Sequence, residues 1–63
     1  MNEVLHSVEA GDMTMYVTYD LFNERFNVCV KRYGHGDDWV YFYKSYKTMN
    51  NAIAAGMKRM PKN

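Results

Sequence analysis

The sequence contains a single cysteine, Cys29, so no disulfide can form within the chain. A lone thiol is typical of proteins in a reducing compartment. No apolar run approaches the roughly 18 residues that a membrane-spanning helix needs. Residues 1–3, Met-Asn-Glu, do not start the basic and apolar regions of a signal peptide. These absences predict a soluble, cytoplasmic protein that does not contact a membrane.

Residues that carry catalysis or hold a metal are also scarce. Cys29, His6 and His35 are the only thiol and imidazoles, and they lack the spacing of a zinc site. No base can be placed beside Cys29 for nucleophilic catalysis. Gly34-His35-Gly36 is followed by acids and a strand, whereas a phosphate-binding loop leads into a helix. We therefore expect no enzymatic activity, metal, cofactor or small-molecule substrate.

Acidic residues are absent from the last part of the chain. Residues 1–38 carry a net charge of −4 and residues 39–63 a net charge of +5. This asymmetry is typical of an anion-binding or nucleic-acid-binding surface, but it also fits a short basic tail. The candidate nucleic-acid contacts in this region are Lys47, Lys58, Arg59 and Lys62.

With 63 residues, 48% of them hydrophobic, the chain has room for one domain, residues 1–63. Alternating apolar and polar residues predict a strand over 13–19 and a second strand around 26–31. With a turn at Asn23-Glu24, one register places every apolar side chain on one face. The predicted pairs in that hairpin are Leu21 with Phe26, Tyr19 with Val28, and Val17 with Val30.

A third strand is predicted over 39–46, after a loop whose glycines permit positive φ. If Tyr33 pairs with Trp39, Arg32 opposes Val40 and Val30 opposes Phe42, so Val40 and Phe42 join the core face. The alternative register, slipped by one residue, would bury Trp39, Tyr41 and Tyr43 instead. The sheet therefore spans 13–46, with its third strand in one of two registers.

A helix is predicted over 48–60, with Thr48 as its N-cap and Pro61 at its end. Its apolar positions follow helical spacing and are expected to pack on the sheet. These positions are Met49, Ala52, Ile53, Gly56, Met57 and Met60. Residues 1–11 fit either an edge strand or a short helix ending at Gly11. The predicted fold is α+β: an antiparallel sheet of three or four strands with one C-terminal helix.

Aromatic residues are abundant, and six of the ten are tyrosines. In the preferred register Tyr19, Phe26 and Phe42 enter the core, and the opposite face displays Tyr16, Tyr33, Trp39, Tyr41 and Tyr43. No second helix is available to cover that face, and an exposed aromatic patch usually marks an interaction site. The candidate partner-binding residues are Tyr16, Lys31, Tyr33, Trp39, Tyr41, Tyr43 and Lys44.

Three interpretations of this face remain open. It binds a protein, which is either a target or a second copy of the chain. It stacks single-stranded nucleic acid, with Lys31 and Lys44 near the phosphates. Or the strand slips by one residue, and the aromatic side chains are core.

The segment Tyr-Lys-Thr-Met-Asn-Asn-Ala-Ile at 46–53 resembles the sheet-to-helix junction of AP2-type and integrase-arm DNA-binding domains. Those domains read the major groove with a three-stranded sheet. The resemblance covers eight residues. Asn51 stands where that family usually has an acid, and the sheet lacks the family's arginine density. The resemblance implies a shared way of joining sheet to helix.

The short chain beginning at Met1, its Met-, Tyr- and Asn-rich composition, and a helix over 48–55 on a small sheet resemble a second group. These are the small early proteins of bacteriophages, of the host-takeover or anti-defence type. The resemblance implies a compact domain that acts in the host cytoplasm and inhibits a host protein by covering one of its surfaces. We therefore expect a non-enzymatic protein-binding module. The alternatives are a nucleic-acid-binding protein and a homodimerising structural domain.

Overall fold

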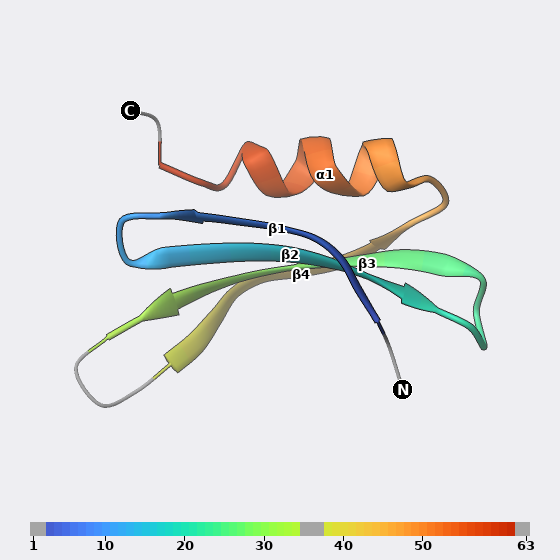
Figure 1. Cartoon of the computed structure of the whole chain (residues 1–63), viewed down its shortest axis with the longest axis horizontal. Coiled ribbons are helices and arrows are strands. Elements are labelled where there is room, and N and C mark those ends of the chain that lie inside the picture. The colour runs from blue at the N-terminus through green and yellow to red at the C-terminus, as the bar shows by residue number, and fades with distance from the viewer. Residues whose placement is uncertain (1–2, 35–37, 62–63) are drawn as a thin grey trace.

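Four antiparallel strands form one open sheet, and a helix follows them in the chain (Figure 1). The computed structural model describes residues 3–34 and 38–61. The strands are β1 (Val4–Ala10), β2 (Met13–Asp20), β3 (Arg25–Tyr33) and β4 (Asp38–Tyr46), and their order in the sheet is β1-β2-β3-β4. The helix α1 spans Met49–Met57. The predicted α+β fold is confirmed, in its four-stranded form.

Strand β1 takes the edge position, so the strand is the correct alternative for the N-terminal segment. Gly11 provides the tight connection to β2 with a φ of 62°, a left-handed conformation that glycine adopts without steric cost. Val8 then pairs with Met15 and Ala10 with Met13, which extends the apolar face of β2. Residues 1 and 2 of the predicted segment lie outside the described residues.

The register of the β2–β3 hairpin differs from the prediction by two residues. Tyr19 pairs with Phe26 and Val17 with Val28, where we expected Val28 and Val30 as their partners. The turn is therefore four residues long, 21–24, and Leu21 is 70% exposed at its start. Side chains alternate with a period of two, so a slip of two residues leaves all the remaining apolar side chains of the hairpin on their predicted face. Hydrophobic pattern alone could not distinguish the two registers.

A bulge in β4 corrects the prediction that Val40 joins the core. Val30 pairs with Phe42 as expected, but Lys31 then pairs with Val40, which leaves Tyr41 as an extra residue. The bulge reverses the alternation beyond Tyr41. Val40 is consequently 53% exposed, whereas Phe42 packs against the core.

Helix α1 starts as the sequence predicts. The Thr48 hydroxyl accepts a hydrogen bond from the Asn51 amide at 3.2 Å, which satisfies one of the free donors of the first turn. The regular helix ends at Met57. Beyond it, the amides of Arg59 and Met60 each donate a hydrogen bond to the carbonyl three residues earlier. Met60 is buried, but Met57 is 47% exposed and leaves the predicted apolar stripe.

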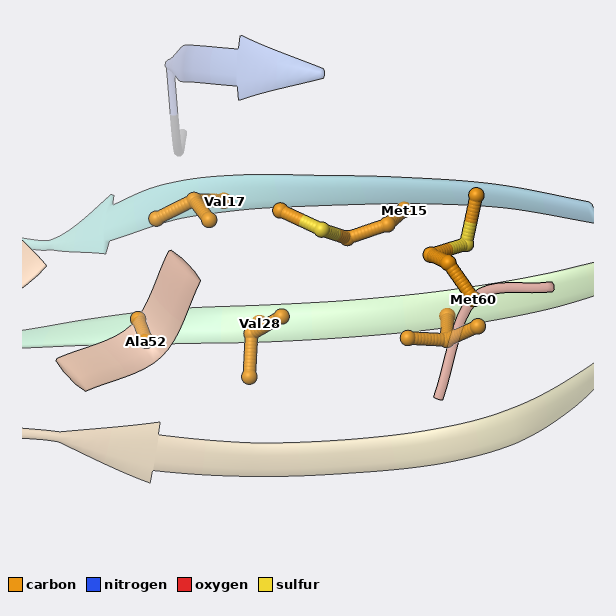
Figure 2. Close-up of a cluster of buried hydrophobic side chains, with 6 residues drawn as sticks. Met15, Val17, Val28, Ala52 and Met60 are labelled. Atoms are coloured by element: carbon orange, nitrogen blue, oxygen red, sulfur yellow. The ribbon is translucent and has the colours of Figure 1, made fainter. Parts of the chain in front are cut away.

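The core lies between α1 and the central strands β2 and β3. Its fully buried side chains are Met15, Val17, Val28 and Val30. Ala52 of the helix and Met60 just after it pack against them (Figure 2). No helix in the described part of the chain is long and apolar enough to span a membrane.

Gly56 allows the helix to lie close to the sheet. A Cβ atom added at this position would lie 2.7 Å from Sδ of Met15 and 2.8 Å from Cγ2 of Val28. Both side chains are fully buried, so neither can move aside without displacing its neighbours. The missing side chain at position 56 thus sets the distance between helix and sheet.

We expect Gly56→Ala to lower the free energy of unfolding. Alanine gains up to about 1 kcal/mol of helix propensity, but overpacking the core costs about 1–3 kcal/mol. The net loss should be about 1 kcal/mol in urea denaturation. The matched control is Ala54→Gly at an exposed helix position, which measures propensity alone. An increase in stability for Gly56→Ala would contradict the close packing.

Candidate interaction surface

The sheet has one face that no described element covers. Helix α1 packs against β2, β3 and β4 on the other side. We define the open face by the residues that the register or the bulge places on the uncovered side of β2, β3 and β4. Its aromatic and neighbouring members are Tyr16, Cys29, Lys31, Tyr33, Val40, Tyr41 and Tyr43.

One row of the open face consists of Tyr16, Cys29 and Tyr43, which are direct neighbours across three strands. Cys29 is only 5% exposed although no helix covers it, whereas Tyr43 is 60% exposed. The flanking rings are therefore placed to shield the thiol; Tyr16 is half-buried, and Tyr43 remains open to solvent. In the next row, the Ser45 hydroxyl donates to Oδ1 of the buried Asn27 at 2.6 Å, so that polar side chain is satisfied.

The bulge places more apolar surface beside this row. Val40 pairs with Lys31 across the strands, and Tyr41 is the extra residue next to it. Val40, Tyr41 and Tyr33 are 53%, 58% and 44% exposed. Together with Tyr43 they form a continuous run of exposed apolar side chains along β4 and the end of β3.

The lysine of the open face is held against an aromatic ring. Nζ of Lys31 lies 5.7 Å from the centre of the Tyr16 ring, within the range of a cation–π contact. Hydrogen bonding to the neighbouring Tyr16 phenol raises the pKa of Lys31 above its ordinary value. Desolvation by burial raises the pKa of Tyr16, so the phenol stays neutral.

Two of the sequence-predicted residues, Trp39 and Lys44, do not lie on the open face. Trp39 pairs with Arg32 and Lys44 pairs with Val28, both on the side where the helix packs. Trp39 lines an open pocket of about 550 Å³ at the end of the sheet. Beside it lies an ion pair in which Nε of Arg32 is 2.9 Å from Oδ2 of Asp12. The hydrogen bond from Arg32 lowers the pKa of Asp12.

Of the predicted nucleic-acid contacts, Arg59 lies on the helix side of the sheet. The Arg59 guanidinium lies 3.9 Å from the centre of the Phe42 ring and donates to the Ala55 carbonyl, so it belongs to the helix side. Lys47 precedes the helix and Lys58 caps its end, and both are exposed. Lys62 lies outside the described residues. The structure therefore places Arg59 on the opposite side of the sheet from the exposed tyrosines.

Sequence reasoning missed the residues of the β2–β3 turn. Leu21 was expected in the core and Phe22 was given no role, yet they are 70% and 95% exposed. The signal was the pair Asp20 and Asn23, because such residues favour a turn through side-chain bonds to nearby amides. That pairing would have indicated a turn of four residues.

Among the residues that the structure describes, no group of three or more His, Cys, Asp or Glu side chains is placed to hold a metal ion. No protein-family model, curated protein or solved structure significantly matches the chain. The function must therefore be inferred from the surfaces of this molecule.

We expect Tyr43→Ala to increase the rate at which a thiol reagent labels Cys29 in the folded protein. Removing the ring uncovers a thiol that is otherwise 5% exposed. The rate should rise several-fold, measured with an aromatic disulfide reagent under native conditions. Trp39→Ala is the matched control, since its ring lies on the other side, and it should leave the rate unchanged. Equal rates for wild type and Tyr43→Ala would show that this ring does not shield Cys29.

Proposed function

We propose that this chain is a small, non-enzymatic protein-binding module and that it binds its partner with the open face. The supporting observation is the run of exposed apolar side chains, Tyr33, Val40, Tyr41 and Tyr43, on a sheet face that no described element covers. Contiguous exposed apolar surface of this kind usually marks an interaction site. Tyrosine is also among the residues enriched at the energetic centre of protein interfaces.

The charge distribution favours a protein over a nucleic acid as the partner. Stacking of single-stranded nucleic acid needs aromatic rings next to a cationic track for the phosphates. Near the exposed tyrosines the open face offers Lys31, which already contacts the Tyr16 ring. Arg59 and Lys44 lie on the helix side. These two cations are thus on the other side of the sheet from the exposed tyrosines, which favours a protein partner.

The proposed mechanism is steric. The tyrosines of β4 supply anchors that lose water on binding, and Lys31 orients the encounter by its charge. The sheet beneath them is fixed by pairing with β3, so little backbone conformational entropy is lost on binding. The resemblance to phage early proteins suggests a host protein in the cytoplasm, with one of its working surfaces covered, as the target.

The experiment is an affinity capture from bacterial lysate, with and without nuclease, followed by calorimetry with the captured protein. The test variant is Tyr41→Ser with Tyr43→Ser, and the control is Trp39→Ser on the other side of the sheet. Both tyrosines are more than half exposed, so the melting temperature should change little. The double variant should weaken binding by at least about 2 kcal/mol, or roughly 30-fold.

Three results would contradict the proposal. Loss of capture after nuclease treatment would assign the surface to nucleic acid. Equal binding of the double variant and wild type would place the interface elsewhere. A large fall in the melting temperature of the double variant would show that the two rings support the fold.

A further inference from the structure

Strand β1 forms an edge of the sheet that no other described strand pairs with. The direction of its backbone groups follows from the neighbouring strands. The Tyr33 amide donates a hydrogen bond to the Asp12 carbonyl at 2.8 Å, so that carbonyl points toward β3. Backbone groups alternate in direction along an antiparallel strand. The amides and carbonyls of Met13, Met15 and Val17 therefore point the other way, toward β1.

The same alternation identifies the outward groups of β1. Ala10, Val8 and His6 pair with those three residues of β2, so their amides and carbonyls face β2. The amides and carbonyls of Ser7 and Glu9 therefore face away from the sheet. An edge with free backbone donors and acceptors can pair with an added strand from another chain.

The two edges of the sheet differ in their protection against such pairing. At the other edge, β4 is interrupted by the bulge at Tyr41 and carries Lys44, and bulges and lysines both hinder strand addition. The irregularity in β1 lies between Val4 and His6. From His6 to Ala10 the strand is regular and contains no lysine, arginine or proline. The outward edge of β1 is therefore the one suited to a further strand.

The β1 side of the molecule is acidic. Residues 3–24 contain five acids and no lysine or arginine. Asp12 and Asp20 lie opposite arginines of β3, which offset their charge. Glu3 and Glu9 are exposed, and within the described part of the chain they form no ion pair. The edge is therefore complementary in charge to a basic segment.

The side chains of β1 also indicate the pattern of that segment. On the helix side, Val8 and Ala10 are only half-buried against the core, because α1 packs mainly on β2, β3 and β4. On the other side of the strand, Glu9 is exposed. Successive side chains of an added strand alternate between the same two sides of the sheet. The matching segment therefore alternates apolar and basic residues.

An apolar groove at the start of β1 has room for one larger side chain of the segment. It has a volume of about 280 Å³ and is lined by Glu3, Leu5, Tyr19, Leu21 and Phe26. Leu5 belongs to β1 and Glu3 directly precedes the strand, so the groove reaches the edge. The Tyr19 and Phe26 rings are 5.0 Å apart at an angle of 58°. A groove at the lower end of the range for small-ligand pockets fits a single aromatic side chain.

We propose that the edge of β1 binds an extended, basic segment of a partner protein, which joins the four-stranded sheet as an additional strand. The backbone groups of Ser7 and Glu9 hold its main chain, and its basic side chains lie beside the Glu9 carboxylate. One aromatic side chain of the segment enters the groove next to Glu3. In complexes of this kind, main-chain bonds provide affinity and side-chain positions provide specificity.

The charge of the edge favours such a segment over a second copy of the chain. The β1 region of a second copy would bring the same two acids, Glu3 and Glu9, to the interface and no lysine or arginine to offset them. The proposal also uses none of the open-face tyrosines, because β1 and β4 are opposite edges of the sheet.

The test uses a synthetic seven-residue peptide, as long as β1, in which lysine alternates with valine and phenylalanine replaces the last valine. Its binding to the full chain is measured by fluorescence anisotropy at low ionic strength, where charge attraction is least screened. Wild type should bind this probe, and the amide signals of Ser7 and Glu9 should shift and exchange more slowly in NMR spectra. A probe with glutamate in place of lysine should bind at least about tenfold more weakly.

Two changes test the backbone contact directly. Ser7→Pro removes an outward amide but no bond to β2, so it should keep the fold and raise the dissociation constant at least about tenfold. Ser7→Ala is the matched control and should bind as wild type does. Circular dichroism checks the fold of both variants. The second change leaves the protein intact: of two probes methylated at alternate backbone amides, only the one whose methyl groups face β1 should lose binding.

Three outcomes would overturn the proposal. The first is a wild-type chain that does not bind the lysine probe, or binds the glutamate probe equally well. The second is equal binding of the two methylated probes, or unchanged binding by a folded Ser7→Pro variant. The third is a wild-type dimer in sedimentation that Ser7→Pro abolishes, which would assign the edge to a second copy. None of these results bears on partner capture by the open face, so each proposal can fail without the other.

Discussion

The contact of Gly56 with Met15 and Val28 is the constraint on which the molecule depends. It brings a nine-residue helix close enough to two strands to complete a core of small and medium side chains. A helix of that length covers only one side of the sheet. The other side must therefore be stable in water or be covered by another molecule, because a small domain has little further apolar surface to bury. The character of the open face follows from this shortage of covering elements.

Much of the fold could be predicted from local patterns. The alternation in β2 and β3, the Thr48 cap and the spacing of Ala52 and Met60 each report a local preference that the packing did not override. The errors arose where the hydrophobic pattern carries no information about strand register. A slip of two residues leaves the same side chains on each face, so the alternating pattern does not reveal it. The alternation in one part of β4 likewise does not reveal an extra residue in another part.

The same errors decided how well the candidate site was predicted. The positions of Tyr16 and Tyr43 depend on strand pairing that the bulge does not change. Tyr33 lies on β3, and the bulge in β4 leaves it on its predicted side. All three tyrosines lie on the open face. Trp39 lies beyond the bulge and changes sides. Lys44 was predicted to accompany the tyrosines, yet alternation in the strand itself places it on the helix side, next to Tyr46.

The distribution of side chains over the sheet gives the molecule two distinct ends. Near the β3–β4 end, exposed tyrosines and Val40 lie flat on a broad surface, which suits a broad complementary partner surface. At the β2–β3 end, one ring projects from a turn held by the Asp20 carboxylate. An apolar groove lined by Leu5, Tyr19 and Phe26 lies at the same end of the molecule. Because the two surfaces share no described side chain, substitutions at one should leave the other intact.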